Sequence, residues 1–399
     1  MASPPTFATA ATCFFVLFYA GSGCSAPRSV GDADSVFPNV IGILPAALPR
    51  AIKSFDAYHL EYELLVANSG QAPVVIRDVE ATNGNGKRIA ELSEEEVASR
   101  LASKEKGRVQ PGETAVLVMS VSAERAADLK SVTHQIRVSS EGEGARVFNV
   151  MGGTVHVEDQ ARADFAPPVR GGSWLVLGPF DARLPGRRHS VDIDGFRVFP
   201  NRFEISLSKM AEKGGTVVGA GASNSDYAAF GEPVYAMADG RVLQVVNHMP
   251  DHGPGRPDAA NPDGNFVLTE VGEEYVVYAG LQNGSISLKL GDSIKRGDVI
   301  GRIGNSGASA EPELRVRLIS APDPLRATGL EFGFRSFRWV GWLKGADTLR
   351  ERPPSLAPGG GKRRPRAQSC SSDAALTLLT IGEGLLTPSP CGARGCGIL

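Results

Sequence analysis

Apolar residues recur at every second position in several short segments of the first half of the chain. From Leu60 onward they alternate with Glu61 and Glu63, which predicts a strand that buries one face. Further strand-like runs, separated by turns rich in Gly, Asn and Pro, span residues 76–79, 115–121, 134–139 and 146–157. Glu94–Leu101 predicts a short helix. This succession predicts an immunoglobulin-like β-sandwich over residues 50–160.

The second half of the chain continues with shorter strands and with glycines at the turns. Residues 233–242 predict a strand, an Asp-Gly turn and a second strand, and residues 264–268 and 275–281 predict two more. Glycines at such turns allow a β domain to fold back tightly on itself. We therefore expect an all-β protein, with a second β domain over residues 161–350.

Composition narrows the function classes. Hydrophobic residues make up 42% and charged residues 22%, which is typical of globular proteins. The net charge of −2 leaves no excess of cations for neutralising phosphates, which excludes a general nucleic-acid binder. All five cysteines lie outside residues 25–369, so the body of the chain holds neither a thiol nucleophile nor a cysteine zinc site.

The two ends of the chain differ from the body. Residues 1–26 contain the apolar run Phe7–Ala20, which predicts a signal peptide or lipoprotein leader, although no Lys or Arg precedes Arg28. A disordered apolar leader is the alternative. We expect an exported protein, whether periplasmic, envelope-anchored or extracellular, that touches the membrane only through a possible lipid on Cys24. Residues 27–49 predict a linker, and the Pro-, Gly- and Arg-containing residues 351–399 a disordered tail.

Five ordered segments carry a family resemblance. They read FGEPVYAMADGRV, GNFVL, YAGLQNGSISLKLGD, KRGDVIGRIGNSG and EPELRV. Their order and spacing over residues 187–342 resemble the lysostaphin/LytM-type zinc metallopeptidases, peptidase family M23, which cut peptide cross-links in bacterial cell wall. The resemblance implies a LytM-type β-sheet core, the duplicated hybrid motif, and is closest to a branch in which an immunoglobulin-like sandwich comes first.

The family's zinc and catalytic residues are replaced. The resemblance implies an early H-x-x-x-D element, a YAHL element and an HLH element. The first falls on Arg202 and Ser206, and YAHL has Gly280 in place of its histidine. The HLH element has Glu313 and Arg315 in place of its two histidines.

These replacements predict an inactive domain. Arginine is permanently cationic and cannot coordinate zinc, and a zinc hydrolase needs about three protein ligands. We expect no cofactor, an ion-pair cluster of Arg202, Glu313 and Arg315 in the old metal cavity, and a binding groove that also includes Tyr278. Zinc would be required only if a working metallopeptidase uses substituted ligands.

His248, Asp251 and His252 are the weak alternative for a metal site, because Pro250 forbids the helical spacing of a zincin H-x-x-x-H. Polarity of a surface loop is the simpler interpretation. We expect the domain to bind peptidoglycan peptide or a cell-wall hydrolase. An active zinc metalloendopeptidase and a purely structural envelope protein remain as alternatives.

Overall fold

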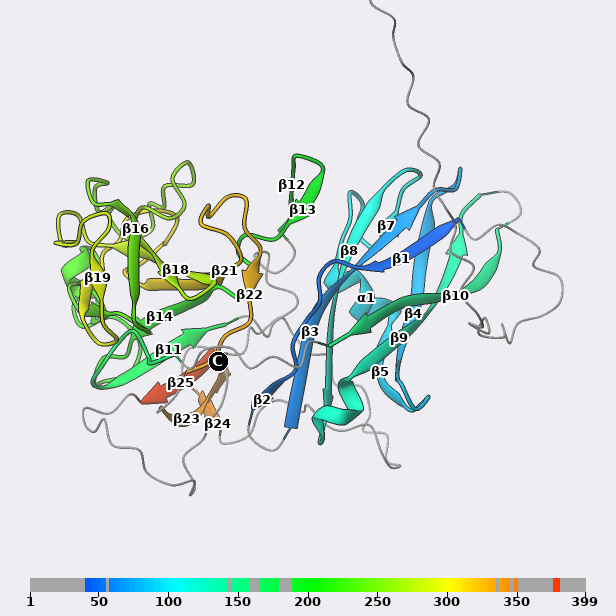
Figure 1. Cartoon of the computed structure of the whole chain (residues 1–399), viewed down its shortest axis with the longest axis horizontal. Helices are drawn as coiled ribbons and strands as arrows, with labels where there is room; N and C mark the ends of the chain where they lie inside the picture. Colours follow the sequence, from blue (N-terminus) through cyan, green and yellow to red (C-terminus); the bar gives the residue numbers. More distant parts are fainter. Residues whose placement is uncertain are drawn as a thin grey trace, which may run out of the picture. The chain divides into compact units, whose positions relative to one another are not determined.

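The protein is described from a computed structural model, and its architecture is all-β, as predicted (Figure 1). The described residues are 40–54, 57–142, 145–157, 165–178, 189–334, 337–344, 348–350 and 376–380. The predicted leader at residues 1–26 and Cys24 lie outside them. No helix in the described part of the chain has the length and apolar character needed to cross a membrane.

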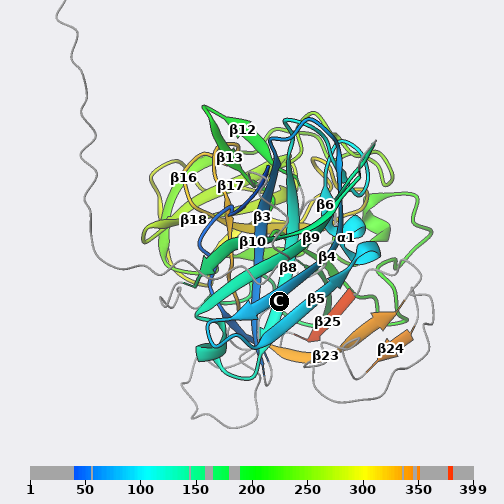
Figure 2. The same cartoon turned by 90° about the vertical axis from the view of Figure 1, so that its right-hand side faces the viewer.

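The first domain is a sandwich of two five-stranded antiparallel sheets. One sheet has the order β1-β3-β8-β6, with β2 on β3; its strands are β1 Ile41–Pro45, β2 Ile52–Ser54, β3 Ala57–Asn68, β6 Leu101–Ala102 and β8 Thr114–Ala123. The other has the order β10-β9-β4-β5 (Figure 2), and β7 also pairs with β4. Its strands are β4 Val74–Asn83, β5 Arg88–Ser93, β7 Arg108–Val109, β9 Ser131–Ser140 and β10 Val147–His156. Alternate residues of both sheets fill one core between them.

The sandwich confirms the predicted strands and adds detail. The predicted helix is α1 Glu94–Arg100, whose Ser93 and Glu96 form a capping box. Ile41–Pro45, expected in the linker, instead pairs with β3 as β1. The half-buried pattern expected for β3 is also corrected, because Glu61 and Glu63 are buried together with the apolar face.

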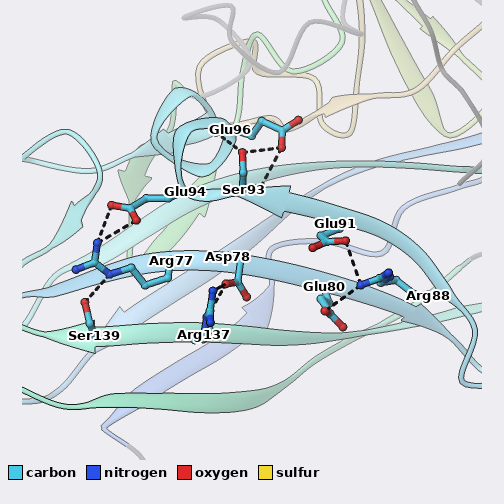
Figure 3. Close-up of polar contacts among 10 residues, drawn as sticks. All are labelled: Arg77, Asp78, Glu80, Arg88, Glu91, Ser93, Glu94, Glu96, Arg137 and Ser139. Carbon is cyan, nitrogen blue, oxygen red and sulfur yellow. Dashed lines mark hydrogen bonds and ion pairs between the residues drawn. The ribbon is translucent and has the colours of Figure 1, made fainter. Parts of the chain in front are cut away.

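Polar residues of β4, β5 and β9 carry matched ion pairs (Figure 3). Arg77 pairs with Glu94 at 2.8 Å, and Arg88 pairs with Glu91 at 3.0 Å. Arg137 donates to Asp78 at 2.6 Å. Each exposed pair contributes at most about 1 kcal/mol. Because the charges are matched, these residues form no unpaired cluster that would point to a ligand, in agreement with the sequence.

The second domain is organised by an eleven-stranded sheet of order β19-β16-β17-β18-β21-β14-β11-β25-β23-β24, with β22 on β21. Its central strands are β11 Ser173–Leu177, β14 Ile205–Lys209, β16 Gly240–Val246, β17 Asn265–Val271, β18 Glu274–Leu281 and β21 Leu314–Ile319. Its outer strands are β19 Ser293–Ile294, β22 Gly329–Leu330, β23 Arg338–Lys344, β24 Thr348–Arg350 and β25 Leu376–Thr380. Two ribbons complete the domain, β12 Val191–Ile193 with β13 Phe196–Val198 and β15 Pro233–Tyr235 with β20 Val299–Arg302.

One segment of the tail belongs to this sheet. Leu376–Thr380 pairs with β11 and β23, so the prediction of a disordered tail is wrong for these residues. The run Leu-Thr-Leu-Leu-Thr has the β-branched and apolar character of a strand, and backbone pairing satisfies its N–H and C=O groups. The rest of residues 351–399 lies outside the described part.

A buried Tyr–His pair lies in the sandwich. The Tyr62 hydroxyl is 2.7 Å from His134 Nε2, and His134 Nδ1 is 2.9 Å from the Gly153 carbonyl oxygen. A carbonyl oxygen only accepts, so Nδ1 carries the hydrogen and Nε2 accepts from the tyrosine. Burial lowers the pKa of His134 from 6.5 to about 4, so the imidazole is neutral in the folded protein.

This low pKa predicts acid sensitivity of the sandwich. The unfolded chain binds a proton at His134 near pH 6.5, whereas the folded protein does not until about pH 4, so stability falls as the pH falls through this window. Between pH 6.5 and 4.5 the protein should lose about 2–3 kcal/mol more of its free energy of unfolding than His134→Gln does. Urea unfolding of both proteins at the two pH values measures this. Parallel losses would contradict the assignment.

Candidate functional site

Three neighbouring strands bring most of the predicted site residues together. Arg315 on β21 is paired with Ser206 on β14 and with Ala279 on β18. Gly280 follows Ala279 directly, and Glu313 lies immediately before β21. The structure therefore places Ser206, Gly280, Glu313 and Arg315 at one location, as the resemblance implies for its metal cavity.

Gly280 occupies a position that excludes side chains. The pairing of β17 with β18 shifts between Asn265 and Phe266, and Gly280 is the extra residue in this irregularity, with φ of +78°. A Cβ at this position would lie 2.8 Å from the backbone oxygen of Glu313. A histidine would need both a strained backbone and a shift of β21, so Gly280 is a structural requirement here.

Glu313 is a buried carboxyl group. Ser309 Oγ donates a hydrogen bond of 2.9 Å to it. Burial raises the pKa of Glu313, although Ser309, the charge of Arg315 and a hydrogen bond from Ser206 oppose the rise. Glu313 thus accepts hydrogen bonds from two serines, whereas the ion pair of Arg315 is formed with Glu204, at 3.8 Å.

Glu204 belongs to a charge network that the sequence did not reveal. The network consists of Glu204, Asp263, Arg315 and Arg317. Arg317 is 3% exposed and lies 2.8 Å from Glu204 and 2.6 Å from Asp263. Burial alone would raise the pKa of Asp263, but the charge and hydrogen bonds of Arg317 lower it overall. Two cations and two anions thus neutralise one another.

One signal for this network was present in the sequence. Arg315 and Arg317 are two apart in the strand Leu314–Ile319, so their side chains share one face of it. Two arginines on one face of a buried strand require carboxylate partners. The identity of those partners depends on the fold, because Glu204 and Asp263 are distant in sequence.

Arg202 does not join this cluster. It is 1% exposed, and its guanidinium group lies 2.8 Å from Glu63 and 3.3 Å from Glu331. The expected cluster of Arg202, Glu313 and Arg315 is therefore corrected: Arg202 and Arg315 belong to separate ion-pair clusters. The buried carboxylates of Glu63 on β3 and of Glu331 hold Arg202, which also explains why Glu63 is not exposed.

Tyr278 also differs from its expected place in a binding groove. It is fully buried, and its hydroxyl oxygen accepts a hydrogen bond of 2.8 Å from the backbone N–H of Met237. Burial raises the pKa of Tyr278. The side chain is part of the core and cannot contact a ligand from solvent.

The weak alternative metal site has another role. Asp251 accepts backbone hydrogen bonds from Asn305 at 2.7 Å and Asn283 at 3.1 Å, and so anchors its loop. His252 Nε2 is 3.8 Å from Asp258. In the described part of the chain no three His, Cys, Asp or Glu residues are grouped so that they could hold a metal ion, and His248 is not part of such a group.

The residues present do not fit zinc. Gly280 offers no donor atom and excludes one, and Arg315 places a cation where the family has a ligand. Glu313 has a raised pKa and is held by Ser309. A single carboxyl group beside guanidinium groups does not make a zinc site, which takes three protein ligands and an open position.

Comparisons with known proteins agree with the resemblance. Residues 211–326 match Peptidase family M23. The chain is 25% identical to the protein in the crystal structure of cbpa from L. salivarius REN, with a TM-score of 0.18. The match covers 25% of this chain and 53% of that one, so this chain spans about half the length of that protein. It is 15% identical to a zinc containing peptidase from Vibrio cholerae, covering 70% of this chain and 83% of that one, with a TM-score of 0.26.

The chain is 13% identical to Helicobacter pylori Csd3, and the match covers 72% of each of the two chains, with a TM-score of 0.24. No curated protein matches the sequence. The predicted resemblance to family M23 is confirmed, and it lies in the second domain.

The family match begins at Ala211, after Arg202 and Ser206, so the assignment of the H-x-x-x-D element to those two residues stays a prediction. The same spacing also occurs inside the matched segment, with Ala222 four residues before Asp226. The Asp226 carboxylate accepts backbone hydrogen bonds from Ala222 at 2.9 Å and Ser223 at 3.0 Å. These hydrogen bonds, that of Ser223 first, lower the pKa of Asp226, and the alanine supplies no metal ligand.

The charge network predicts unequal effects of two matched substitutions. Glu204→Gln leaves Arg315 and Arg317 to share Asp263, and should lower the free energy of unfolding by about 3 kcal/mol. Glu313→Gln keeps an acceptor for Ser309 and should cost less than about 1 kcal/mol. Urea denaturation at pH 7 measures both, and equal losses would contradict the network.

The chemistry of the site also predicts the metal content. Protein purified at neutral pH should contain no stoichiometric zinc by elemental analysis, because the described residues supply no three-ligand set. About one zinc per chain that disappears in the His248→Ala/His252→Ala variant would show that a site has been rebuilt in the 248–252 loop.

Proposed function

We propose, from the match of residues 211–326 to Peptidase family M23, that this is an exported cell-envelope protein whose peptidase-like domain binds without cleaving. Its ligand would be peptidoglycan peptide or a cell-wall hydrolase. The single observation that carries the proposal is the buried network of Glu204, Arg315, Arg317 and Asp263 beside Gly280.

The network argues against hydrolysis for a physical reason. Metallopeptidase chemistry needs a metal-bound water and a group that moves protons. At this location the two guanidinium groups cannot accept a proton, Glu204 and Asp263 are already paired with them, and Glu313 accepts a hydrogen bond from Ser309. The rival function, a zinc metalloendopeptidase with substituted ligands, has no described residues that supply its ligands.

The rest of the domain supports binding, because the fold around the network is intact. Buried strands β14, β18 and β21 keep a continuous apolar core, and the loops around them are tied by backbone hydrogen bonds. A fold that has lost its chemistry can still present the surfaces that recognised its former substrate or a protein partner. Such a surface is what the proposed function uses.

The test combines retention and digestion. Purified full-length protein is sedimented with isolated cell-wall sacculi, and the supernatant is analysed for soluble peptides by mass spectrometry. We expect no release of peptides with or without a chelator, together with either co-sedimentation or faster digestion when a purified cell-wall amidase is added. Heat-unfolded protein is the control.

Two outcomes would overturn the proposal. Peptide release that a chelator abolishes would support the active metallopeptidase. Neither retention on sacculi nor any effect on the amidase would favour a purely structural envelope protein.

A further inference from the structure

The long connection between β16 and β17 lies against the segment that leads into β21. We call its residues 252–264 the strap. Backbone hydrogen bonds tie the strap to residues 305–310; they are His252 N–H to Asn305 O at 3.0 Å, Gly255 N–H to Ala310 O at 2.7 Å, Asp258 N–H to Gly307 O at 2.7 Å and Ala308 N–H to Pro262 O at 3.0 Å. A long polar connection is thus held as firmly as a pair of strands.

Two consecutive strap carbonyl groups are bound at two of the replaced family positions, Gly280 and Arg315. The backbone N–H of Gly280 donates to the Asp263 oxygen at 3.0 Å. The Arg315 guanidinium group donates to the Pro262 oxygen. Two of the positions where the resemblance expects histidines therefore hold a peptide backbone that belongs to the chain itself.

A side-chain contact also holds the strap in place. Both carboxylate oxygens of Asp263 accept from Arg317, at 2.6 and 2.7 Å. A two-pronged charged contact of this kind sets both position and direction. The network that replaces the metal therefore also anchors the strap.

Gly307 makes this close approach possible. A Cβ at Gly307 would lie 2.5 Å from the Pro262 oxygen and 2.7 Å from the Gly264 nitrogen. Gly264 in turn approaches the backbone of Ser306 and Gly307 too closely for a side chain. Both segments must have a glycine where they cross, which is typical of a closely packed contact rather than of a free loop.

We propose that the strap is a built-in pseudosubstrate that occupies the former catalytic position of the domain. A peptide from solvent can reach Gly280 and Arg315 only after the strap has left them. The identity of the excluded peptide, a peptidoglycan stem peptide, rests on the proposed function. Of the two ligands proposed above, the strap favours a cell-wall hydrolase that contacts the outer surface of the domain.

Hydrogen–deuterium exchange of the full chain tests the strap directly. The matched variants are Gly307→Ala, whose methyl group would displace Pro262, and Gly231→Ala, which has a similar positive φ and no heavy atom within 4 Å of the new Cβ. We expect peptides that contain Gly280 and Ala308 to exchange on the order of tenfold faster in Gly307→Ala than in the native chain or in Gly231→Ala. Unchanged exchange in β3 and β8 shows that the variant is folded.

A second pair of variants covers the case in which Gly307→Ala fails to fold. Asp263→Asn removes the anchor of the strap, and Asp194→Asn removes an exposed partner of Arg326 as its control. Faster exchange of Gly280 and Ala308 is again expected in the first variant alone. The strap is refuted if these amides exchange in the native chain as fast as in the displaced variants, or if both variants of a pair behave alike.

A third experiment tests the functional consequence of the strap and uses calorimetry to follow the binding of a purified stem tetrapeptide. We expect no heat of binding with the native chain or Gly231→Ala, and a gain of binding with Gly307→Ala. Native binding that further protects Gly280 would overturn the pseudosubstrate. Failure of the proposed function can be distinguished from failure of the strap proposal. In that case the strap amides would stay protected from exchange, while the protein would neither co-sediment with sacculi nor affect the amidase.

Discussion

Arg315 and Arg317 lie two residues apart on one face of β21, inside the sheet of the second domain. A buried guanidinium group is costly unless carboxylates and carbonyl groups take up its hydrogen bonds. Glu204, Asp263 and the Pro262 carbonyl group meet most of this requirement, and among the described residues only Arg315 Nε and Arg317 Nε of the two groups have no hydrogen-bond partner. The course of the strap and the neutrality of the network both depend on pairing these two cations.

The same requirement connects stability with function. In a zinc peptidase a metal ion is the local positive charge, and its open position receives substrate. Here guanidinium groups supply the positive charge, and the chain's own backbone fills the position beside them. Because guanidinium groups offer five N–H donors and no acceptor, they hold carbonyl and carboxylate groups but activate no water. The two buried guanidinium groups thereby fix the neighbouring carboxylates and the Pro262 carbonyl group in place.

Local patterns predicted much of the architecture. The strand that contains Leu60 and Val66, the helix after Ser93 and the ordered glycine-rich segments of the second domain all appear in the structure. The site was predicted in part: Ser206, Gly280, Glu313 and Arg315 do meet. Arg202 and Tyr278 do not take part, because ion pairing with Glu63 holds the first and burial against Met237 holds the second.

By itself the sequence determined the all-β class, the order of the two domains and the family resemblance, because each depends on residue type and short-range spacing. Only the tertiary structure decided which carboxylate each buried arginine would hold. It also decided that residues 252–264 would lie across Gly280 and Arg315, and that Gly280 must have a positive φ. Those outcomes depend on which strands become neighbours, and electrostatic pairing between residues far apart in the chain leaves no periodic pattern in the sequence.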